Sequence, residues 1–168
     1  MRIRAGAVLF LLVLPAAASA QAVAALSPLY ENIKGNLIKS ADQMAEADYA
    51  FKPTPAVRSF GQLVGHMANA NFAICSTAKG EKSPATQDFE KVTEKAALVK
   101  ALRDAFAYCD AVFKLPDASF SPMAELFGMK MSRLSFLMLN VAHDNEHYGN
   151  MVTYFRLKGM VPPSSQGG

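Results

Sequence analysis

Apolar residues recur at spacings of three and four along four separate segments of the chain, which is the period of an amphipathic α-helix. The first segment covers about residues 27–47, and the second begins at Ser59 and ends before Gly80. The third covers about residues 93–114, and the fourth covers about residues 132–157. No segment carries the alternation of apolar and polar residues that a half-buried strand shows. We therefore predict an all-α fold, a four-helix bundle.

Capping residues and glycine mark the ends of these helices. Ser27 is the expected N-cap of the first helix, with Pro28 at the first helical position. Ser59, with Gln62 three residues later, has the pattern of a capping box. Gly159 suits the position just beyond the fourth helix.

The link between the third and fourth helices, residues 118–131, is long, and we expect it to be irregular. Its length permits a crossover in place of a hairpin. Residues 21–160 are predicted to form a single domain. Residues 161–168 are expected to be a disordered or lightly packed tail.

The first 20 residues are typical of a secretory signal peptide. Arg2 and Arg4 provide a basic start, and residues 5–14 form an apolar stretch that Pro15 ends. Small residues lead up to Ala20, where we expect cleavage. The apolar stretch is too short to span a bilayer, so the sequence predicts an exported protein, periplasmic or secreted, with no membrane anchor after cleavage.

The charge of the mature chain excludes one class of partner. The whole chain has 17 basic and 14 acidic residues, and two of the basic ones are Arg2 and Arg4. Removal of the signal leaves 15 basic residues against 14 acidic ones, a net charge of +1. No basic patch remains that would favour nucleic acid as a partner.

Two cysteines, Cys75 and Cys109, lie in the second and third predicted helices. In an oxidising compartment such a pair predicts a disulfide, and the alternative is two buried thiols that act as small apolar residues. The absence of a Cys-x-x-Cys pattern argues against redox catalysis.

A polar stripe runs through the otherwise apolar fourth helix. It consists of Asn140, His143, Asp144, His147 and Asn150, at spacings that place all five on one side of the helix. Polar groups on a buried helix cost free energy unless they find partners. The stripe is therefore a candidate site.

The chain has only three histidines, and their positions suggest a metal site. His143 and His147 are one helical turn apart, so their imidazoles can reach one ion. The third, His66, lies early in the second helix and could join them if the second and fourth helices are neighbours. Three protein ligands with an open position are typical of a catalytic metal site. The alternative is a surface histidine pair with a separate, buried His66.

The sequence resembles a known family, the DinB/YfiT-like four-helix-bundle proteins. The matching pieces are residues 51–53, 58–66, 140–150 and 154–159 together with Pro162-Pro163, and they span nearly the whole mature chain. They include the order of one histidine early in the second helix and His-x-x-x-His in the fourth. The resemblance implies that His66, His143 and His147 bind a divalent metal ion, Ni, Zn or a similar ion such as Fe or Mn.

The resemblance also implies an up-down-down-up bundle, and with the long link we expect its crossover between helices 3 and 4. It further implies frequent homodimers and, in some relatives, transfer of a low-molecular-weight thiol. This chain departs from the commoner pattern by its export signal. Such thiols are mainly cytosolic, so an exported protein is poorly placed for thiol transfer.

The carboxylates near the histidines are assigned separately. Asp144 is the candidate catalytic residue, as a base that acts on metal-bound water or as a partner of a ligand. Glu146 is interpreted as an ordinary helix carboxylate. Asn140, Asn150 and Asn69 are candidate partners for imidazole N–H groups, and the alternative is that they only cap the pocket. The remaining assignments place Tyr148 and Tyr154 in the core or pocket wall, and Lys52 and Arg58 in solvent.

Three functions follow from these assignments. The first is a metal-dependent hydrolase or transferase in which water on a three-histidine metal attacks an unknown small-molecule substrate. The second is a binding module that carries a metal or small ligand without turnover. In the third, the metal only holds the helices together.

Overall fold

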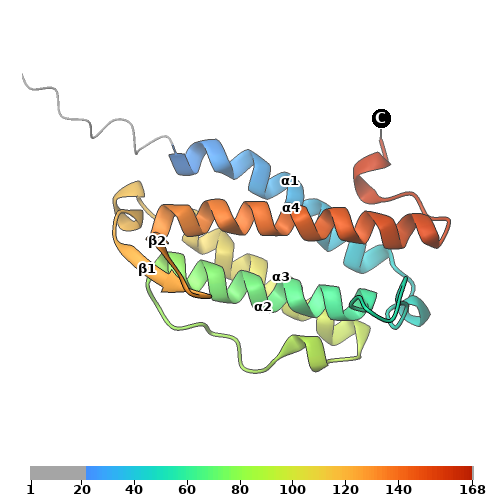
Figure 1. Cartoon of the computed structure of the whole chain (residues 1–168). Coiled ribbons are helices and arrows are strands. Elements are labelled where there is room, and N and C mark those ends of the chain that lie inside the picture. The colour runs from blue at the N-terminus through green and yellow to red at the C-terminus, as the bar shows by residue number, and fades with distance from the viewer. Residues whose placement is uncertain (1–21, 168) are drawn as a thin grey trace, which may run out of the picture.

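The computed structural model describes residues 22–167, which form a bundle of four long helices (Figure 1). These are α1 (Ala22–Gln43), α2 (Phe60–Lys79), α3 (Lys95–Val112) and α4 (Arg133–Leu157). The predicted all-α bundle is confirmed. The signal peptide predicted for residues 1–20 lies outside the described residues.

Most predicted helix ends are confirmed by the capping geometry. The hydroxyl of Ser59 accepts a hydrogen bond from the backbone N–H of Gln62, whose side chain accepts from the Ser59 N–H in return. Gly80 ends α2 with a left-handed backbone, φ 84°, and Gly159 follows α4 with φ 69°. A side chain at these two positions would be strained.

The start of α1 differs from the prediction. The helix begins at Ala22, so Ser27 is not its N-cap and Pro28 lies inside it. The hydroxyl of Ser27 donates to the carbonyl of Val23 within the helix, 2.9 Å away. Because a serine hydroxyl can bond to a carbonyl within a helix as well as cap a helix start, the Ser27-Pro28 pair did not mark the beginning of α1.

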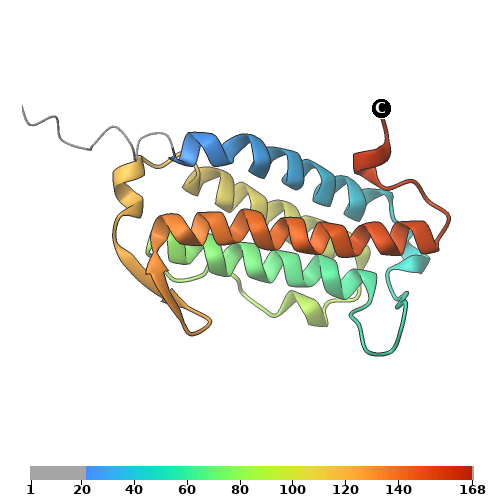
Figure 2. The same cartoon turned by 45° about the horizontal axis from the view of Figure 1, so that its top comes forward.

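Helices α2 and α3 run in the same direction. Gly61 lies against Leu98 near the start of both helices, and Cys75 is bonded to Cys109 near their far ends. The crossover therefore lies between α2 and α3. Residues 80–94 return along the outside of the bundle, and this segment includes the short helix η4 (Phe89–Lys91) (Figures 1 and 2).

The other helices complete the up-down-down-up arrangement, since α1 runs opposite to α2 (Figure 1). Helix α4 is antiparallel to α2, since Asn71 contacts Asp144 while the earlier His66 contacts the later His147. The predicted arrangement is thus present, but the predicted crossover between helices 3 and 4 is wrong. Helix α4 starts at the end of the bundle where α3 stops (Figure 2).

The link between α3 and α4, predicted to be irregular, contains regular structure. A short helix, η5 (Asp117–Phe120), is followed by strands β1 (Met123–Leu126) and β2 (Met129–Ser132), which pair as an antiparallel hairpin. The two turn residues are Phe127, φ 53°, and Gly128, φ 74°. Phenylalanine is a rare residue in the left-handed region, so the sequence lacked the Asn-Gly or Asp-Gly signal of such a turn.

The core is aromatic and is cross-linked. The largest fully buried side chains include Tyr30, Phe60, Phe106, Phe120, Phe136 and Phe155. The predicted disulfide is present, since Cys75 and Cys109 are bonded and both are fully buried between α2 and α3.

The chain after α4 is more ordered than predicted. Pro162 and Pro163 are buried, and η6 (Pro163–Ser165) follows. The backbone N–H of Ser164 donates to the hydroxyl of Tyr148 at 2.8 Å. The described part of the tail is therefore packed on the bundle, because two proline rings cover apolar surface at little entropic cost. A further short helix, η3 (Glu46–Asp48), follows α1.

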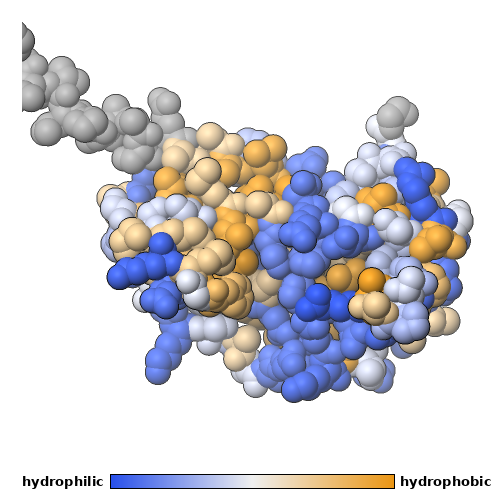
Figure 3. Space-filling view, viewed as in Figure 1, coloured by the Kyte–Doolittle hydropathy of each residue, from blue (hydrophilic) through white to orange (hydrophobic). Residues whose placement is uncertain are grey.

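The surface has distinct apolar and polar regions. On the face shown in Figure 3, apolar residues gather at the end of the bundle where α4 begins and hydrophilic residues dominate the middle. Among residues 22–167, no helix has the length and apolar character needed to cross a membrane.

Candidate metal centre

The three histidines meet between α2 and α4. His66 comes from the second turn of α2, and His143 and His147 come from successive turns of α4. One ring nitrogen from each lies within 4.8 Å of the others, and the ring centroids are 4.4–5.3 Å apart. The arrangement requires α2 and α4 to be neighbours, which was the condition that the sequence left open. The three side chains could hold one metal ion.

A carboxylate that the sequence did not reveal orients the first of these rings. Oε1 of Glu90 lies 2.7 Å from Nδ1 of His66, and its Oε2 accepts from Nε of Arg58 at 2.8 Å. A carboxylate on Nδ1 fixes the tautomer and leaves Nε2 free as a ligand. Arg58, predicted to be solvated, is 41% exposed but is committed to this ion pair.

Glu90 reaches the site because η4 lies directly on α2. The side-chain amide of Asn69 donates to Asp88 at 2.8 Å, and its oxygen accepts from the backbone N–H of Phe89 at 3.0 Å. Gly65 permits the approach, since a Cβ there would clash with the carbonyl of Phe89. Asn69 therefore supports the site through the linker, and not by the direct imidazole contact that was predicted.

The two histidines of α4 differ in their partners. Nδ1 of His147 lies 3.3 Å from the side-chain amide of Asn150, the contact expected for Asn150. Nδ1 of His143 is buried and has no hydrogen-bond partner among the described residues. An unsatisfied buried nitrogen costs about 1–3 kcal/mol, which coordination of an ion would relieve.

The surroundings keep these rings neutral. Burial, together with the nearby His147, His66 and Arg58, lowers the pKa of His143 to about 4. Burial and the neighbouring His66 also lower the pKa of His147. Burial raises the pKa of Glu90, but the bonds to Arg58 and His66 outweigh that effect and hold it below its usual value. Neutral imidazoles beside an ionised carboxylate are the protonation states that metal binding needs.

A family comparison decides the membership of the chain. The family model described as the DinB superfamily matches residues 29–151, well over half of the chain. The chain belongs to the DinB superfamily. No curated protein matches the sequence.

Solved structures share this DinB fold. A DinB-like protein from Bacillus cereus matches with a TM-score of 0.68 and 20% identity, over 78% of this chain and 89% of that one. A DinB-like protein from Bacillus subtilis matches with a TM-score of 0.62 and 19% identity, over 84% and 93%. A mutant of a mycothiol-dependent maleylpyruvate isomerase matches with a TM-score of 0.64 and 12% identity, over 77% of this chain and 60% of that one.

Asp144, the predicted catalytic residue of this DinB protein, lies away from the convergent histidine nitrogens. It is 1% exposed, and its Oδ1 accepts from the side-chain amide of Asn71 at 2.9 Å. Asn140 donates to the same Asn71 at 2.8 Å, so its side-chain amide is not the imidazole partner that was one of its two expected roles. Burial outweighs the Asn71 bond and raises the pKa of Asp144 to about 8. Its catalytic role stays a prediction that this position does not favour.

The other residues assigned from the sequence lie close to expectation. Glu146 is exposed on α4, which agrees with an ordinary helix carboxylate. Tyr148 and Tyr154 are buried, and the hydroxyl of Tyr154 donates to the carbonyl of Arg58. Tyr154 therefore helps to place Arg58 beside Glu90. Lys52 is exposed, as predicted.

Proposed function

We propose that this DinB protein binds one divalent metal ion through His66, His143 and His147 and is a metal-dependent hydrolase or transferase of a small molecule. The observation that carries the proposal is the convergence of three imidazoles on one point that borders two cavities. Within residues 22–167, the convergent ligand group contains these three side chains and no fourth. Three protein ligands are typical of catalytic metal sites, whereas structural zinc sites have four.

A divalent ion held in this way supplies a Lewis acid and lowers the pKa of a coordinated water. The residues of the chain prepare the site. Glu90 fixes the orientation of His66, and Arg58 keeps the Glu90 carboxylate ionised. Asn150 contacts Nδ1 of His147. The identity of the metal is open, because Zn, Ni, Fe and Mn all accept imidazole.

Hydrolysis fits this chain better than thiol transfer does. The solved isomerase of similar fold is named as mycothiol-dependent, which supports small-molecule chemistry in this fold. The disulfide between Cys75 and Cys109 and the signal-like residues 1–20 favour an oxidising compartment, where low-molecular-weight thiols are scarce. We therefore propose that the protein is exported after cleavage behind Ala20 and uses water as the second reactant.

Cobalt(II) substitution tests for an open position on the metal. The visible spectrum of the cobalt protein should show bands of a histidine-coordinated ion, and millimolar azide should shift those bands. If azide does not shift the bands and the melting temperature falls sharply when the metal is removed, the metal is structural. Light scattering on the same purified protein tests whether it forms the homodimer that the family resemblance implies.

A further inference from the structure

Two cavities of opposite character meet at the histidines. An apolar cavity of about 400 Å³ lies between α2, α4 and the hairpin, with His66 and His143 in its wall. A second cavity, of about 700 Å³, is bordered by the loop of residues 52–58 and contains His147. Glu90 borders both. One bound molecule could therefore occupy both cavities and pass the metal ligands between them.

The hairpin gives the apolar cavity its outer wall. Phe127 and Met129 line the cavity from the hairpin, and Ile74 and Leu139 line it from the two helices. Phe127 is 67% exposed and has a left-handed backbone, φ 53°. A large apolar side chain that is both exposed and held in a costly conformation at a cavity rim suggests a role in ligand contact.

The second cavity carries positive charge. Lys52 and Arg58 both border it, and Glu90 is its one acidic lining residue. Glu90 is committed to Arg58 and His66, and Lys52 has no ion pair within residues 22–167. Imidazole ligands carry no negative charge that would offset a divalent ion, so a bound ion would make the cavity still more positive.

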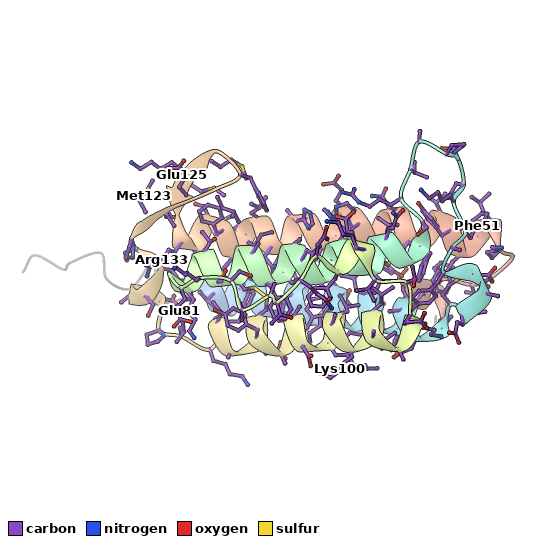
Figure 4. The ribbon with its side chains drawn as sticks, turned by 90° about the horizontal axis from the view of Figure 1, so that it is seen from below. Phe51, Glu81, Lys100, Met123, Glu125 and Arg133 are labelled. Carbon is purple, nitrogen blue, oxygen red and sulfur yellow. A yellow bond between two sulfur atoms is a disulfide. The ribbon has the colours of Figure 1, made fainter. Side chains whose placement is uncertain are left out.

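The two ends stand apart on one face of the molecule. Figure 4 shows the hairpin, marked by Met123 and Glu125, and the loop after Phe51 at opposite ends of the same long face. A ligand that lies along this face would have its apolar end under the hairpin and its charged end under the loop.

We propose that the substrate is an amphipathic carboxylate, with an apolar group in the cavity under the hairpin and its anionic group beside Lys52 and Arg58. This inference rests on the proposed function, because it names the substrate class of the same site. Since a cavity of about 150 Å³ can hold benzene, one of about 400 Å³ accommodates an aryl group or a chain of about six to ten carbons.

Calorimetry with simple probes tests the substrate class in the zinc-loaded protein. Phenylbutyrate carries both an apolar and an anionic group, whereas butyrate lacks the ring and phenylbutanol lacks the charge. Phenylbutyrate should bind at least about tenfold more tightly than either. Equal affinity for phenylbutanol would overturn the anionic contact, and equal affinity for butyrate would overturn the apolar one.

Variants of the cavity walls locate the binding. Ala73→Leu fills the apolar cavity and should lower the affinity for phenylbutyrate at least about tenfold. Ala111→Leu, on the exposed face of α3, should leave that affinity unchanged. Phe127→Ala lies on the hairpin, outside the helical core, and should lower the affinity for phenylbutyrate severalfold. This variant keeps the test valid even if Ala73→Leu fails to fold.

Lys52→Gln should also lower the affinity for phenylbutyrate, because it removes the charge proposed to contact the carboxylate. Lys39→Gln, an exposed residue of α1, should leave the affinity unchanged. Unchanged affinity in Phe127→Ala and Lys52→Gln would overturn the proposal.

The metal measurements keep the two proposals separate. If zinc binds and azide shifts the cobalt bands, but phenylbutyrate binds no better than butyrate, only the substrate class is wrong. If zinc does not bind, the proposed function fails whatever the probes show.

Discussion

Glu90 is the residue on which the geometry of His66 depends. It lies in the linker before α3, 24 residues after His66, and its carboxylate makes a 2.7 Å contact with Nδ1. Arg58 balances its charge from the other side. Because no spacing rule connects a linker residue with a helix that ended at Lys79, only the three-dimensional structure reveals this partner.

Removal of the Glu90 charge should therefore weaken metal binding. Glu90→Gln removes the negative charge that favours the Nδ1–H tautomer of His66 and raises the basicity of its ring, and mutation of such a partner typically costs about 10–100-fold in metal affinity. Competition with a chromophoric chelator measures the affinity. Glu46→Gln, an exposed carboxylate in η3, is the matched control. Equal zinc affinity in Glu90→Gln and the parent protein would contradict the role of Glu90.

Asp144 should make stability depend on pH. The pKa of its carboxyl is raised to about 8 in the folded protein, against a usual value of 3.8. Between these two pH values the folded state keeps a proton that the unfolded state has released. The stabilisation is complete below about pH 4 and is lost as the pH rises toward 8. Urea unfolding of the metal-free protein should show this decline, and Asp144→Asn should flatten it by at least about 2 kcal/mol across the range. Identical profiles would rule out the buried neutral acid.

At the level of elements, the crossover segment does more than connect α2 to α3. It returns along the bundle and places η4 on α2, where Asn69 bonds Asp88 and Phe89. The close approach depends on Gly65, since a Cβ would meet the Phe89 carbonyl. The backbone contact and the metal ligand thus lie on adjacent residues of α2.

Two glycine variants separate this contact from general helix stability. Gly65→Ala should push η4 away from α2, lower the free energy of unfolding by about 1–3 kcal/mol and weaken zinc binding. Gly35→Ala, where the new Cβ meets no atom within 4 Å, should stabilise α1 by about 0.5–1 kcal/mol and leave zinc binding unchanged. Thermal unfolding and zinc titration of both variants provide the measurements. A tolerated Gly65→Ala with parental zinc affinity would show that η4 is dispensable.

Across the whole molecule, the disulfide fixes the parallel pair on which the crossover depends. Cys75 and Cys109 enclose a loop that contains the entire linker, with a sequence separation of 34. A cross-link of this size typically contributes about 2–4 kcal/mol, mainly by restricting the unfolded chain. The double variant Cys75→Ala and Cys109→Ala should lose about that much in urea unfolding, and reductant should then have no further effect. Equal stability of the variant and the oxidised parent would contradict this role.

The sequence predicted what depends on local pattern. The helices, the capping box at Ser59 and the disulfide pair follow from period, spacing and compartment, and the histidines follow from spacing together with family resemblance. The hairpin was missed because Phe127 is an unusual turn residue, and the crossover was misplaced because helix direction depends on long-range packing. Asp144 was assigned to the metal because a helix position does not reveal which neighbour a side chain faces.

Metal stoichiometry is the sharpest test of whether His66, His143 and His147 together hold one metal ion. Purified protein loaded with zinc and then dialysed should retain one equivalent by mass spectrometry. His66→Ala, His143→Ala and His147→Ala should each retain far less, while remaining folded by circular dichroism. Equal, substoichiometric zinc in the parent protein and all three variants would show that these histidines do not form a metal site.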